Sequence, residues 1–437
     1  MINCRQYRGW QESMKIAFIV SEFPSITETF ILNQITGLID RGHDVTIYAR
    51  SDGNQSVVHS DVTRYRLLDR TFYYGDSCYA NKHSRLLRAI GIALAKSHKK
   101  PMSLLKCLTV LRFEKKAATQ NSFRQLARFL GGTIDSCDIV HCHFGPNGNL
   151  GAWLKNLGVI EGKLITTFHA YDISSFLKEG EHVYDALFET GDLFLPISER
   201  WKKKLIRLGC KGQRIAVHRM GVDTSKFSFT PRKPREDGKV KLLTVARLIE
   251  KKGLQYSVRA MVKVFQKYPH VEYRIVGDGP LKYGLSNLID RLEISNHARL
   301  LGWKRQEEIA RLMHRSDILL APSVTSEDGD QEGIPVVLME ALSQGLPVIS
   351  TQHSGIPELI QDGKSGFLVP ERDVNALAER LEHLIEHPEI WPEMGRAGSD
   401  FVARYHDINK LNDQLVDMYQ RLLDGELPGE VSGPVDV

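Results

Sequence analysis

Short apolar segments rich in β-branched residues alternate with amphipathic stretches along the first half of the chain. This alternation restricts the fold more than any other feature, because strands that alternate with helices form parallel sheets with both faces covered. We expect strands at residues 16–20, 45–49, 139–143, 164–168 and 193–197. Between the first two strands, apolar residues from Phe30 to Ile39 repeat at helical spacing, and Gly42 follows as a stop signal.

The alternation restarts after residues 230–238, a polar segment that contains two prolines and is typical of a linker. The second series of strands is expected at residues 240–245, 272–276, 318–321, 348–350 and 367–369. The chain is therefore predicted to be an α/β protein with two doubly wound, Rossmann-like parallel-sheet domains. Ligands of such domains bind at the carboxyl ends of the strands, so we expect the site in a central cleft that both domains face.

These patterns also predict the boundaries of the parts. We expect an extension at residues 1–13, a first domain at 14–226 with a basic helical insertion at 82–130, and a second domain at 239–405. A helix at 406–424 is expected to brace the two domains, and residues 425–437 form a tail. Residues 1–13 are polar and irregular, and Met14 is an alternative start.

Bulk composition is that of an ordinary globular protein, with 42% hydrophobic and 25% charged residues in a chain of 437. The six cysteines have no framework spacing, which favours a reducing compartment, and we predict a cytoplasmic protein. No apolar run is long enough to span a membrane, and the N-terminus lacks the apolar core of a signal peptide.

The net charge of +5 is unevenly distributed. Residues 82–130 hold twelve Lys or Arg and one acid, Glu114, with apolar residues between them. This pattern is typical of basic amphipathic helices, and we hypothesise that the segment binds an anionic membrane surface, which would make the protein peripheral to a membrane. The alternative is a solvated basic face. No nucleic-acid recognition motif accompanies the charge, so no nucleic-acid partner is predicted.

Two carboxylates, Glu332 and Glu340, flank a glycine-proline turn that opens a helix. Pro335 suits the first helical position, and the free amides of Val336 and Val337 would then form a phosphate-binding helix N-terminus. A fully helical interval would rise about 12 Å, which allows the carboxylates to hold separate parts of one extended ligand such as a sugar nucleotide. The alternative is a solvated first turn that complements the helix dipole.

Two cations favour the ligand interpretation. Arg247 and Lys252 lie in a loop that follows a predicted strand, where they could neutralise a diphosphate leaving group. In the first domain, His169 and Asp172 follow a strand and are expected to face the cleft. Asp172 would either bind an acceptor or brace its own loop, and a packing role for His169 is the alternative.

Other motifs admit a metal or nucleotide interpretation. His141, Cys142 and His143 resemble a zinc motif, but strand geometry places neighbouring side chains on opposite faces. Asp328 and Asp330 resemble a metal-binding pair, although with cations already present they more simply shape the entry to Glu332. We predict no metal and no cofactor.

Two glycine turns follow strands of the second domain. The turn at Gly277 lets the backbone approach a ligand, but it is not the dinucleotide fingerprint. The loop at Gly302 and Trp303 could read a nucleotide base. Further turns at residues 354–358 and 365–369 are expected around the same pocket, with ordinary loops as the alternative.

Taken in order, Arg247, Lys252, Gly277, the pair Glu332 and Glu340, and His169 resemble the retaining GT-B glycosyltransferases, from Met14 to about residue 424. Within that family, residues 21–30, 143–146, 169–174 and 322–340 are similar to the colanic-acid and amylovoran-type exopolysaccharide transferases. The glycine-rich turn that the family carries after its first strand is replaced here by residues 22–25, Glu-Phe-Pro-Ser.

The resemblance implies a role for each matching residue. Glu332 would contact the donor sugar, Glu340 the ribose hydroxyls, Arg247 and Lys252 the diphosphate, and His169 the sugar near the reacting carbon; Glu332, His169, Arg247 and Lys252 would be the catalytic set. The other implied donor contacts are Gly277, Gly302, Trp303, Gly333, Ile334, Pro335, Val336 and Val337. The implied acceptor contacts are Thr27, Glu28, His143 and Asp172.

The implied activity is transfer of a hexosyl unit from a nucleotide-diphosphate sugar, UDP-linked, to a lipid-linked oligosaccharide, with retention of anomeric configuration. It would take place on the cytoplasmic side of the inner membrane. Two alternatives remain: another sugar-nucleotide enzyme on the same architecture, such as an epimerase or a phosphorylase, and a non-catalytic scaffold that binds sugar nucleotides.

Overall fold

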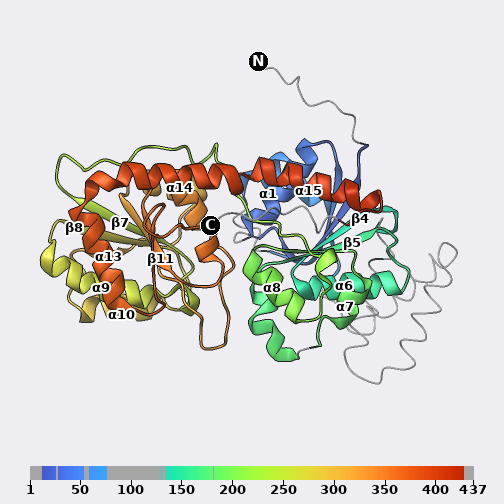
Figure 1. Ribbon diagram of the computed structural model, residues 1–437, viewed down its shortest axis with the longest axis horizontal. Helices are drawn as coiled ribbons and strands as arrows, with labels where there is room; N and C mark the ends of the chain where they lie inside the picture. The colour runs from blue at the N-terminus through green and yellow to red at the C-terminus, as the bar shows by residue number, and fades with distance from the viewer. Residues whose placement is uncertain are drawn as a thin grey trace, which may run out of the picture. The chain divides into compact units, whose positions relative to one another are not determined.

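The computed structural model describes residues 12–25, 28–53, 59–75, 129, 134–180 and 182–427. Apart from Phe129, the predicted basic insertion at 82–130 lies outside these ranges, as do Thr27 and most of the predicted extension and tail. The chain divides into two compact units, shown in Figure 1. The first consists of Met1–Thr167, Tyr184–Phe194 and Val416–Leu427, and the second of Phe168–Val183, Leu195–Leu415 and Pro428–Val437.

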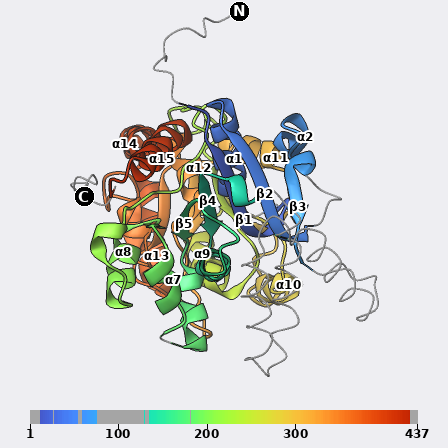
Figure 2. The ribbon, with the colours of Figure 1, turned by 90° about the vertical axis from the view of Figure 1, so that its right-hand side faces the viewer.

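The first sheet has six strands in the order β3-β2-β1-β4-β5-β6, and Figure 2 shows the first five of them in this sequence across the sheet. The pairs β1–β2, β2–β3, β1–β4 and β4–β5 are parallel. The strands are β1 (Lys15–Phe23), β2 (Asp44–Asp52), β3 (Thr71–Tyr73), β4 (Ile139–His143), β5 (Lys163–Phe168) and β6 (Leu193–Pro196). The helices along this part of the chain are α1 (Thr29–Asp40), α2 (Ser60–Arg64), α6 (Gly145–Asn156), α7 (Asp185–Thr190) and α8 (Glu199–Arg207).

Burial explains why five of these strands were predicted and one was not. The central strand β1 is buried from Ile16 to Val20, because helices and neighbouring strands cover it. The predicted helix after it is confirmed as α1, which buries the apolar positions Ile31, Ile35 and Leu38. Strand β3 is a three-residue edge strand with exposed Phe72 and Tyr73, so it has no apolar run to recognise.

The second sheet also has six strands, in the order β12-β11-β10-β7-β8-β9, and its printed pairs are parallel. The strands are β7 (Val240–Val245), β8 (Val271–Val276), β9 (Ala298–Leu300), β10 (Ile318–Ala321), β11 (Val348–Thr351) and β12 (Phe367–Val369). The helices are α9 (Leu254–Lys267), α10 (Lys282–Arg291), α11 (Gln306–His314), α12 (Val336–Ser343), α13 (Val374–Glu386), α14 (Trp391–Tyr405) and α15 (Ile408–Leu423).

Two apolar cores lie on the two faces of this sheet. Leu242 of β7 belongs to the core that includes residues of α9 and α13, whereas its neighbour Leu243 belongs to the core that includes α12. Leu320 and Leu319 of β10 divide in the same way. This alternation is the pattern of a parallel sheet covered by helices on both faces.

Both sheets have the strand order of a doubly wound Rossmann fold, so the predicted fold class is confirmed. In such a sheet the strand order reverses at one point, here between β1 and β4 and between β7 and β10. Ligands of doubly wound sheets bind at the carboxyl ends of the strands that flank this point. The two reversal points therefore define where functional side chains are expected.

The segment predicted as a linker is irregular in structure, but it is tied to the second unit. The guanidinium of Arg232 is buried and donates hydrogen bonds to the carbonyl oxygens of His314 and Gln344. Arg235 forms an ion pair of 2.9 Å with Asp317. These contacts fix the segment against the loops around α11 and α12.

The predicted C-terminal helix is confirmed as α15, and its residues are divided between the units: those up to Leu415 belong to the second and those from Val416 to the first. In the first unit, the buried Tyr419 hydroxyl lies 2.5 Å from Nδ1 of His141, and Nε2 of His141 lies 2.7 Å from the hydroxyl of Thr167. Within the described ranges, no helix is both long and apolar enough to cross a membrane.

Candidate active site

The reversal point of the second sheet brings together the loops that follow β7 and β10. The loop after β7 contains a short 3-10 helix, η6 (Glu250–Lys252), and ends at Gly253 in the left-handed conformation (φ 63°). A methyl group on Gly253 would lie 1.9 Å from the carbonyl oxygen of Pro322, so only glycine fits. The amide of Val324 also donates to the carbonyl of Lys251 at 2.8 Å. The loop that carries Lys252 is thus held against the segment after β10.

The first predicted pair of site residues meets here. Nζ of Lys252 lies 2.9 Å from Oε1 of Glu332, and the neighbouring Lys251 lies 2.8 Å from Asp330. Both aspartates of this loop therefore have partners within the protein. Asp330 pairs with Lys251, and Asp328 accepts hydrogen bonds from the Ser326 hydroxyl and the Asp330 amide. Within the described ranges, no group of three His, Cys, Asp or Glu side chains could hold a metal ion.

Arg247 differs from Lys252. Its side chain is exposed, and it forms no ion pair with any residue of the described part of the chain. Of the two predicted cations, one is therefore paired with a carboxylate and one is open to solvent. Both lie in the loop after β7, and the hydrogen bond from the Leu248 amide to the Asp278 carbonyl holds that loop against the turn after β8.

The environment of Glu332 keeps its carboxylate charged. Burial alone would raise the pKa of Glu332, which is only 7% exposed, but the charges of Lys252 and Lys251 outweigh burial and lower the net pKa below its ordinary value. The side chain is thus an anion at neutral pH. An anionic, buried carboxylate beside a lysine can accept hydrogen bonds from sugar hydroxyls once the lysine turns to another partner.

A histidine that sequence reasoning missed fixes the backbone of Glu332. The amide of Glu332 donates to Nε2 of His353 at 3.0 Å, so Nε2 carries no proton. Nδ1 of the same ring then donates to Oε1 of Glu371 at 2.7 Å, and Glu371 also accepts the amide of Thr325. The hydroxyl of Ser354 donates to the Glu332 carbonyl. The signal in the sequence was a histidine two residues after the end of β11.

The helix after Glu332 begins one residue later than predicted. Pro335 is the N-cap, with an extended backbone (ψ 121°), and the first helical residue is Val336; the assignment of Pro335 to the first helical position was wrong. The Leu338 amide bonds to the Pro335 carbonyl, which restricts the first turn. The amides of Val336 and Val337 have no backbone partner among the described residues and can still bind an anion.

The loop of Glu332 also touches the loop of His169. A methyl group on Gly333 would lie 2.5 Å from the carbonyl oxygen of His169, so glycine is required for this contact. The buried Oδ1 of Asp172 accepts the amides of His169 and Ala170, each at 3.0 Å. The structure therefore shows Asp172 bracing its loop, which was one of its two expected roles, and brings that loop to Glu332. Ile334, next to Gly333, is buried.

Glu340 has an environment unlike that of Glu332. It lies on α12 with 9% of its surface exposed, and burial raises its pKa to about 7 from an ordinary 4.5; a hydrogen bond with Gln306 acts in the opposite direction. The two glutamates thus differ in charge near neutral pH, since Glu332 is ionised and Glu340 is partly protonated.

The glycine turns after β8 and β9 meet. The amide of Gly277 donates to the carbonyl of Gly302 at 2.9 Å, and both residues have positive φ angles. Trp303, beside Gly302, is 42% exposed. Residues 365–369 do not form a turn throughout, because Phe367–Val369 is strand β12; the Ser365 hydroxyl accepts the Gln361 amide in the loop before this strand.

The predicted acceptor residues lie in two places. In the first unit, the buried His143 stacks against both Phe18 and His141, and the carbonyl of Glu28 starts α1 by accepting the amides of Ile31 and Leu32. Thr27 lies outside the described residues. Asp172 and His169 belong to the second unit.

Comparisons with known proteins identify the family of this chain. Residues 226–400 match the family model described as glycosyl transferases group 1. The chain is 39% identical over 415 residues to WcaL of Escherichia coli strain K12, a glycosyltransferase assigned to colanic acid biosynthesis, covering 94% of this chain and all of WcaL. It is 40% identical over 375 residues to the amylovoran biosynthesis glycosyltransferase AmsK of Erwinia amylovora, covering 85% and 90% of the two chains.

Solved structures share the fold at lower identity. The Anabaena protein HepE, crystallised with UDP, superposes with a TM-score of 0.69 at 17% identity, covering 93% of this chain and 100% of that one. Sucrose-phosphate synthase of Thermosynechococcus elongatus gives a TM-score of 0.70 at 17% identity, covering 94% and 100%. The chain belongs to the group 1 glycosyltransferases, with the GT-B fold, and shares that family with the colanic-acid and amylovoran biosynthesis enzymes.

Proposed function

We propose that this protein transfers a hexosyl unit from a UDP-linked sugar to a lipid-linked oligosaccharide, with retention of anomeric configuration. The observation that carries the proposal is the 2.9 Å pair of Lys252 and Glu332 beside the open amides of α12. Exopolysaccharide biosynthesis is the process named for WcaL and AmsK, and UDP is the nucleotide named for HepE. We extend both to this chain.

In the proposed reaction the donor diphosphate competes with Glu332 for Lys252. The ammonium turns to a phosphate oxygen, Arg247 binds a second one, and the α12 amides add hydrogen-bond donors. Glu332, released from Lys252, accepts hydrogen bonds from the sugar, while Glu340 holds the ribose and His169 lies near the reacting carbon. Gly277, Gly302 and Trp303 complete the donor site.

The chemical step exchanges one bond at the anomeric carbon. The bond from that carbon to the diphosphate oxygen breaks, and an acceptor hydroxyl oxygen attacks from the same face. The proton of the hydroxyl passes to the departing diphosphate, so the products are UDP and a glycoside of unchanged configuration. Cations and amides that stabilise the leaving diphosphate provide the main catalytic effect.

The acceptor and the place of action are part of the proposal. Acceptor contacts are assigned to Thr27, Glu28, His143 and Asp172. We place the reaction at the cytoplasmic face of the inner membrane, with the basic segment 82–130 attaching the protein to anionic lipid.

A panel of UDP-, GDP- and ADP-sugars, offered with lipid-linked acceptors, tests the proposal. We expect turnover with a UDP-sugar, and NMR of the product should show the anomeric configuration of the donor. Glu332→Gln and Lys252→Ala should each lower kcat by about 100-fold or more, as loss of a transition-state contact does. Glu389→Gln, at an exposed carboxylate, is the control. Full activity in both site variants would reject the residue assignments, and an inverted product would reject retention.

A further inference from the structure

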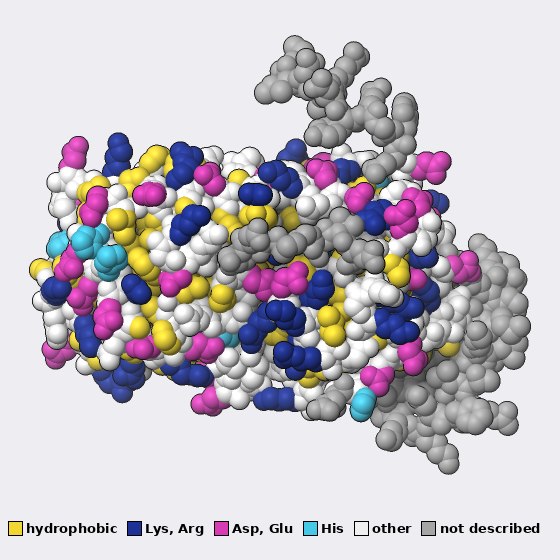
Figure 3. All heavy atoms as spheres, viewed as in Figure 1, with side chains coloured by type: hydrophobic (Ala, Val, Ile, Leu, Met, Phe, Trp, Pro, Cys, Tyr) yellow, Lys and Arg dark blue, Asp and Glu magenta, His cyan; other side chains and the backbone are white. Residues whose placement is uncertain are grey.

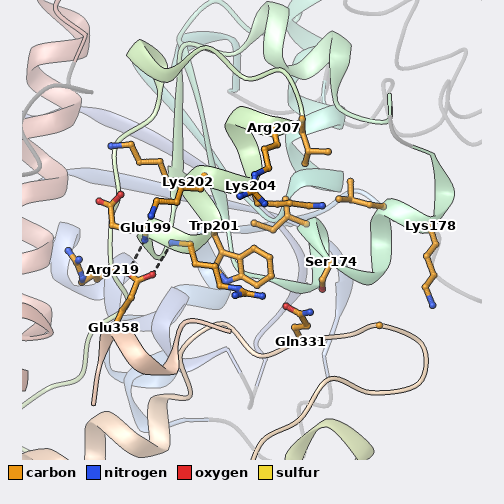
Figure 4. Close-up of a pocket in the computed structure, with 16 residues that line it drawn as sticks. Ser174, Lys178, Glu199, Trp201, Lys202, Lys204, Arg207, Arg219, Gln331 and Glu358 are labelled. Atoms are coloured by element: carbon orange, nitrogen blue, oxygen red, sulfur yellow. Dashed lines mark hydrogen bonds between the residues drawn. The ribbon is translucent and has the colours of Figure 1, made fainter. Parts of the chain in front are cut away.

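A pocket of about 1120 Å³ lies within the second unit, next to the loop that leads to Glu332. Gly329 and Gln331 line it on that side, and residues of α8 and of the 3-10 helix η4 (Ser175–Glu179) line most of the rest, together with Ser174, Arg219 and Glu358. Figure 4 shows Gln331, Trp201 and Lys178 among the residues around the pocket. Its volume suits a ligand of several groups, such as part of an oligosaccharide with its phosphates. The pocket and the Glu332 site therefore share one loop.

The pocket is strongly basic. Seven Lys or Arg residues line it: five from α8, Lys178 from η4, and Arg219. The lining has two acids, Glu199 and Glu358, which leaves an excess of five positive charges. Figure 3 shows the dark-blue side chains of Lys and Arg gathered over α8.

None of these seven cations is neutralised by an ion pair within the described part of the chain. Of the two acids, Glu358 is already engaged, because its carboxylate accepts the amides of Glu199 and Arg200 at the start of α8. The dipole of α8 accounts for Lys204 and Arg207 in its last turn, but not for Lys178 and Arg219, which come from other segments.

Two buried hydrogen-bond groups in the same pocket also lack partners. The indole of Trp201 is 3% exposed, and its Nε1 donor has no hydrogen-bond partner among the described residues. The hydroxyl of Ser174 is buried and without a described partner as well. Buried polar groups are nearly always satisfied in native structures, so two orphans in one basic pocket indicate a missing acceptor. An indole N–H can only donate, which favours an oxyanion.

We infer that this pocket binds the anionic part of the acceptor substrate. The inference rests on the proposed transfer to a lipid-linked oligosaccharide and names the chemistry by which that acceptor is recognised. The oxyanions are either those of the diphosphate that joins lipid to sugar or the carboxylates of acidic sugars. Held by cations of the pocket and by the Trp201 indole, the anionic group would place the neighbouring sugar beside the loop of Glu332.

Calorimetric titration of the full-length protein, saturated with UDP to occupy the donor site, tests the inference. Inorganic pyrophosphate is the probe for the diphosphate, and a glucuronate-containing tetrasaccharide is the probe for acidic sugars. Wild-type protein should bind at least one probe, more weakly at high salt. Lys202→Gln/Lys204→Gln should weaken that binding by about tenfold or more, as loss of charged hydrogen bonds does.

Arg259→Gln/Lys364→Gln is the matched control, since it removes two exposed cations of the second unit outside the pocket. Trp201→Phe, which keeps the aromatic ring but removes the N–H, should also weaken binding. Pyrophosphate binding alone identifies the lipid diphosphate, and tetrasaccharide binding alone identifies acidic sugars. No binding of either probe, or equal loss in both double variants, overturns the inference. Failure of the wild type to bind UDP rejects the proposed donor instead. In that case, comparing probe binding by the two double variants still tests the pocket.

Discussion

The two predicted cations of the candidate site differ in their surroundings. Lys252 pairs with Glu332 at 2.9 Å, while Arg247 stands exposed. An incoming diphosphate could therefore bind Arg247 directly, but it would have to replace Glu332 as the partner of Lys252. In the proposed reaction that exchange would release Glu332, so donor binding would be coupled to the readiness of this carboxylate to bind the sugar.

His353 is predicted to position Glu332 without touching substrate. Replacing it by Ala removes the acceptor for the Glu332 amide and the partner of Glu371, so the loop between β10 and α12 loses its anchor. We expect His353→Ala to lower kcat by about tenfold or more, on the scale of a misplaced catalytic group. His353→Gln, whose side-chain oxygen can accept the same amide, should recover part of the loss. If His353→Ala and the wild type have the same kcat, His353 does not position Glu332.

Glu340 should make stability depend on pH. Burial raises its pKa to about 7 from 4.5, so between these values the folded state keeps a proton that the unfolded chain releases. The free energy of unfolding therefore falls as pH rises through this window. Glu340→Gln lacks the effect, and its stability relative to wild type should increase by about 2 kcal/mol from pH 5.5 to pH 8.5. Urea unfolding at both pH values measures this, and a constant difference would show that Glu340 titrates normally.

The turns that follow strands of the second sheet contain glycines that differ in how well they tolerate substitution by alanine. Gly277, with φ 141°, would place a methyl group 1.8 Å from the Ala246 carbonyl oxygen, whereas Gly302, with φ 69°, has open space. Gly277→Ala should therefore cost about 3 kcal/mol or more of stability, and Gly302→Ala only about 1 kcal/mol. Urea unfolding of the two variants compares them directly. Similar small losses would mean that the β8 turn can relax.

Strands that bury consecutive apolar side chains were predictable, even the three-residue β12, and strands with exposed side chains were not. The runs of β7, β10 and β12 gave their residue limits directly, because a buried strand needs consecutive apolar side chains. The short edge strands β3 and β9 bury few side chains and leave no such pattern. The start of α12 was misplaced by one residue, since proline is compatible with both the N-cap and the first turn.

The site was predictable where charge and spacing carry the chemistry. Lys252 and Glu332 were assigned to one site in advance, because both follow strands of one sheet, but their direct ion pair was not predicted. His353 was not found, since its role depends on a backbone amide contact that no spacing reveals. The basic pocket was missed for a similar reason: Lys178, Arg219 and α8 are separated in sequence, and folding alone brings them together.

For the molecule as a whole, attachment to membranes is predicted from the segment 82–130, which lies outside the described residues and carries twelve cations against one acid. Each Lys or Arg near an anionic surface contributes about 1 kcal/mol. The protein should float with vesicles that contain phosphatidylglycerol but not with phosphatidylcholine alone. Reversing Lys96, Lys99, Lys100 and Lys106 to Glu should abolish flotation.

The matched control for that experiment reverses four exposed cations of the second unit, which are Lys233, Arg259, Arg291 and Lys364. This variant has the same change in net charge and should still float with anionic vesicles. If the wild type floats equally with anionic and neutral vesicles, or with neither, the proposed attachment through residues 82–130 is rejected.

The division of α15 between the two units constrains how the chain is made. Tyr419 fills the core of the first unit and contacts His141 across a separation of 278 residues. Nearly the entire polypeptide must therefore be synthesised before the core of the first unit is complete. Premature termination near residue 415 would remove the part of α15 that packs into the first unit. A stop codon late in the gene should therefore destabilise the N-terminal unit more than the second unit.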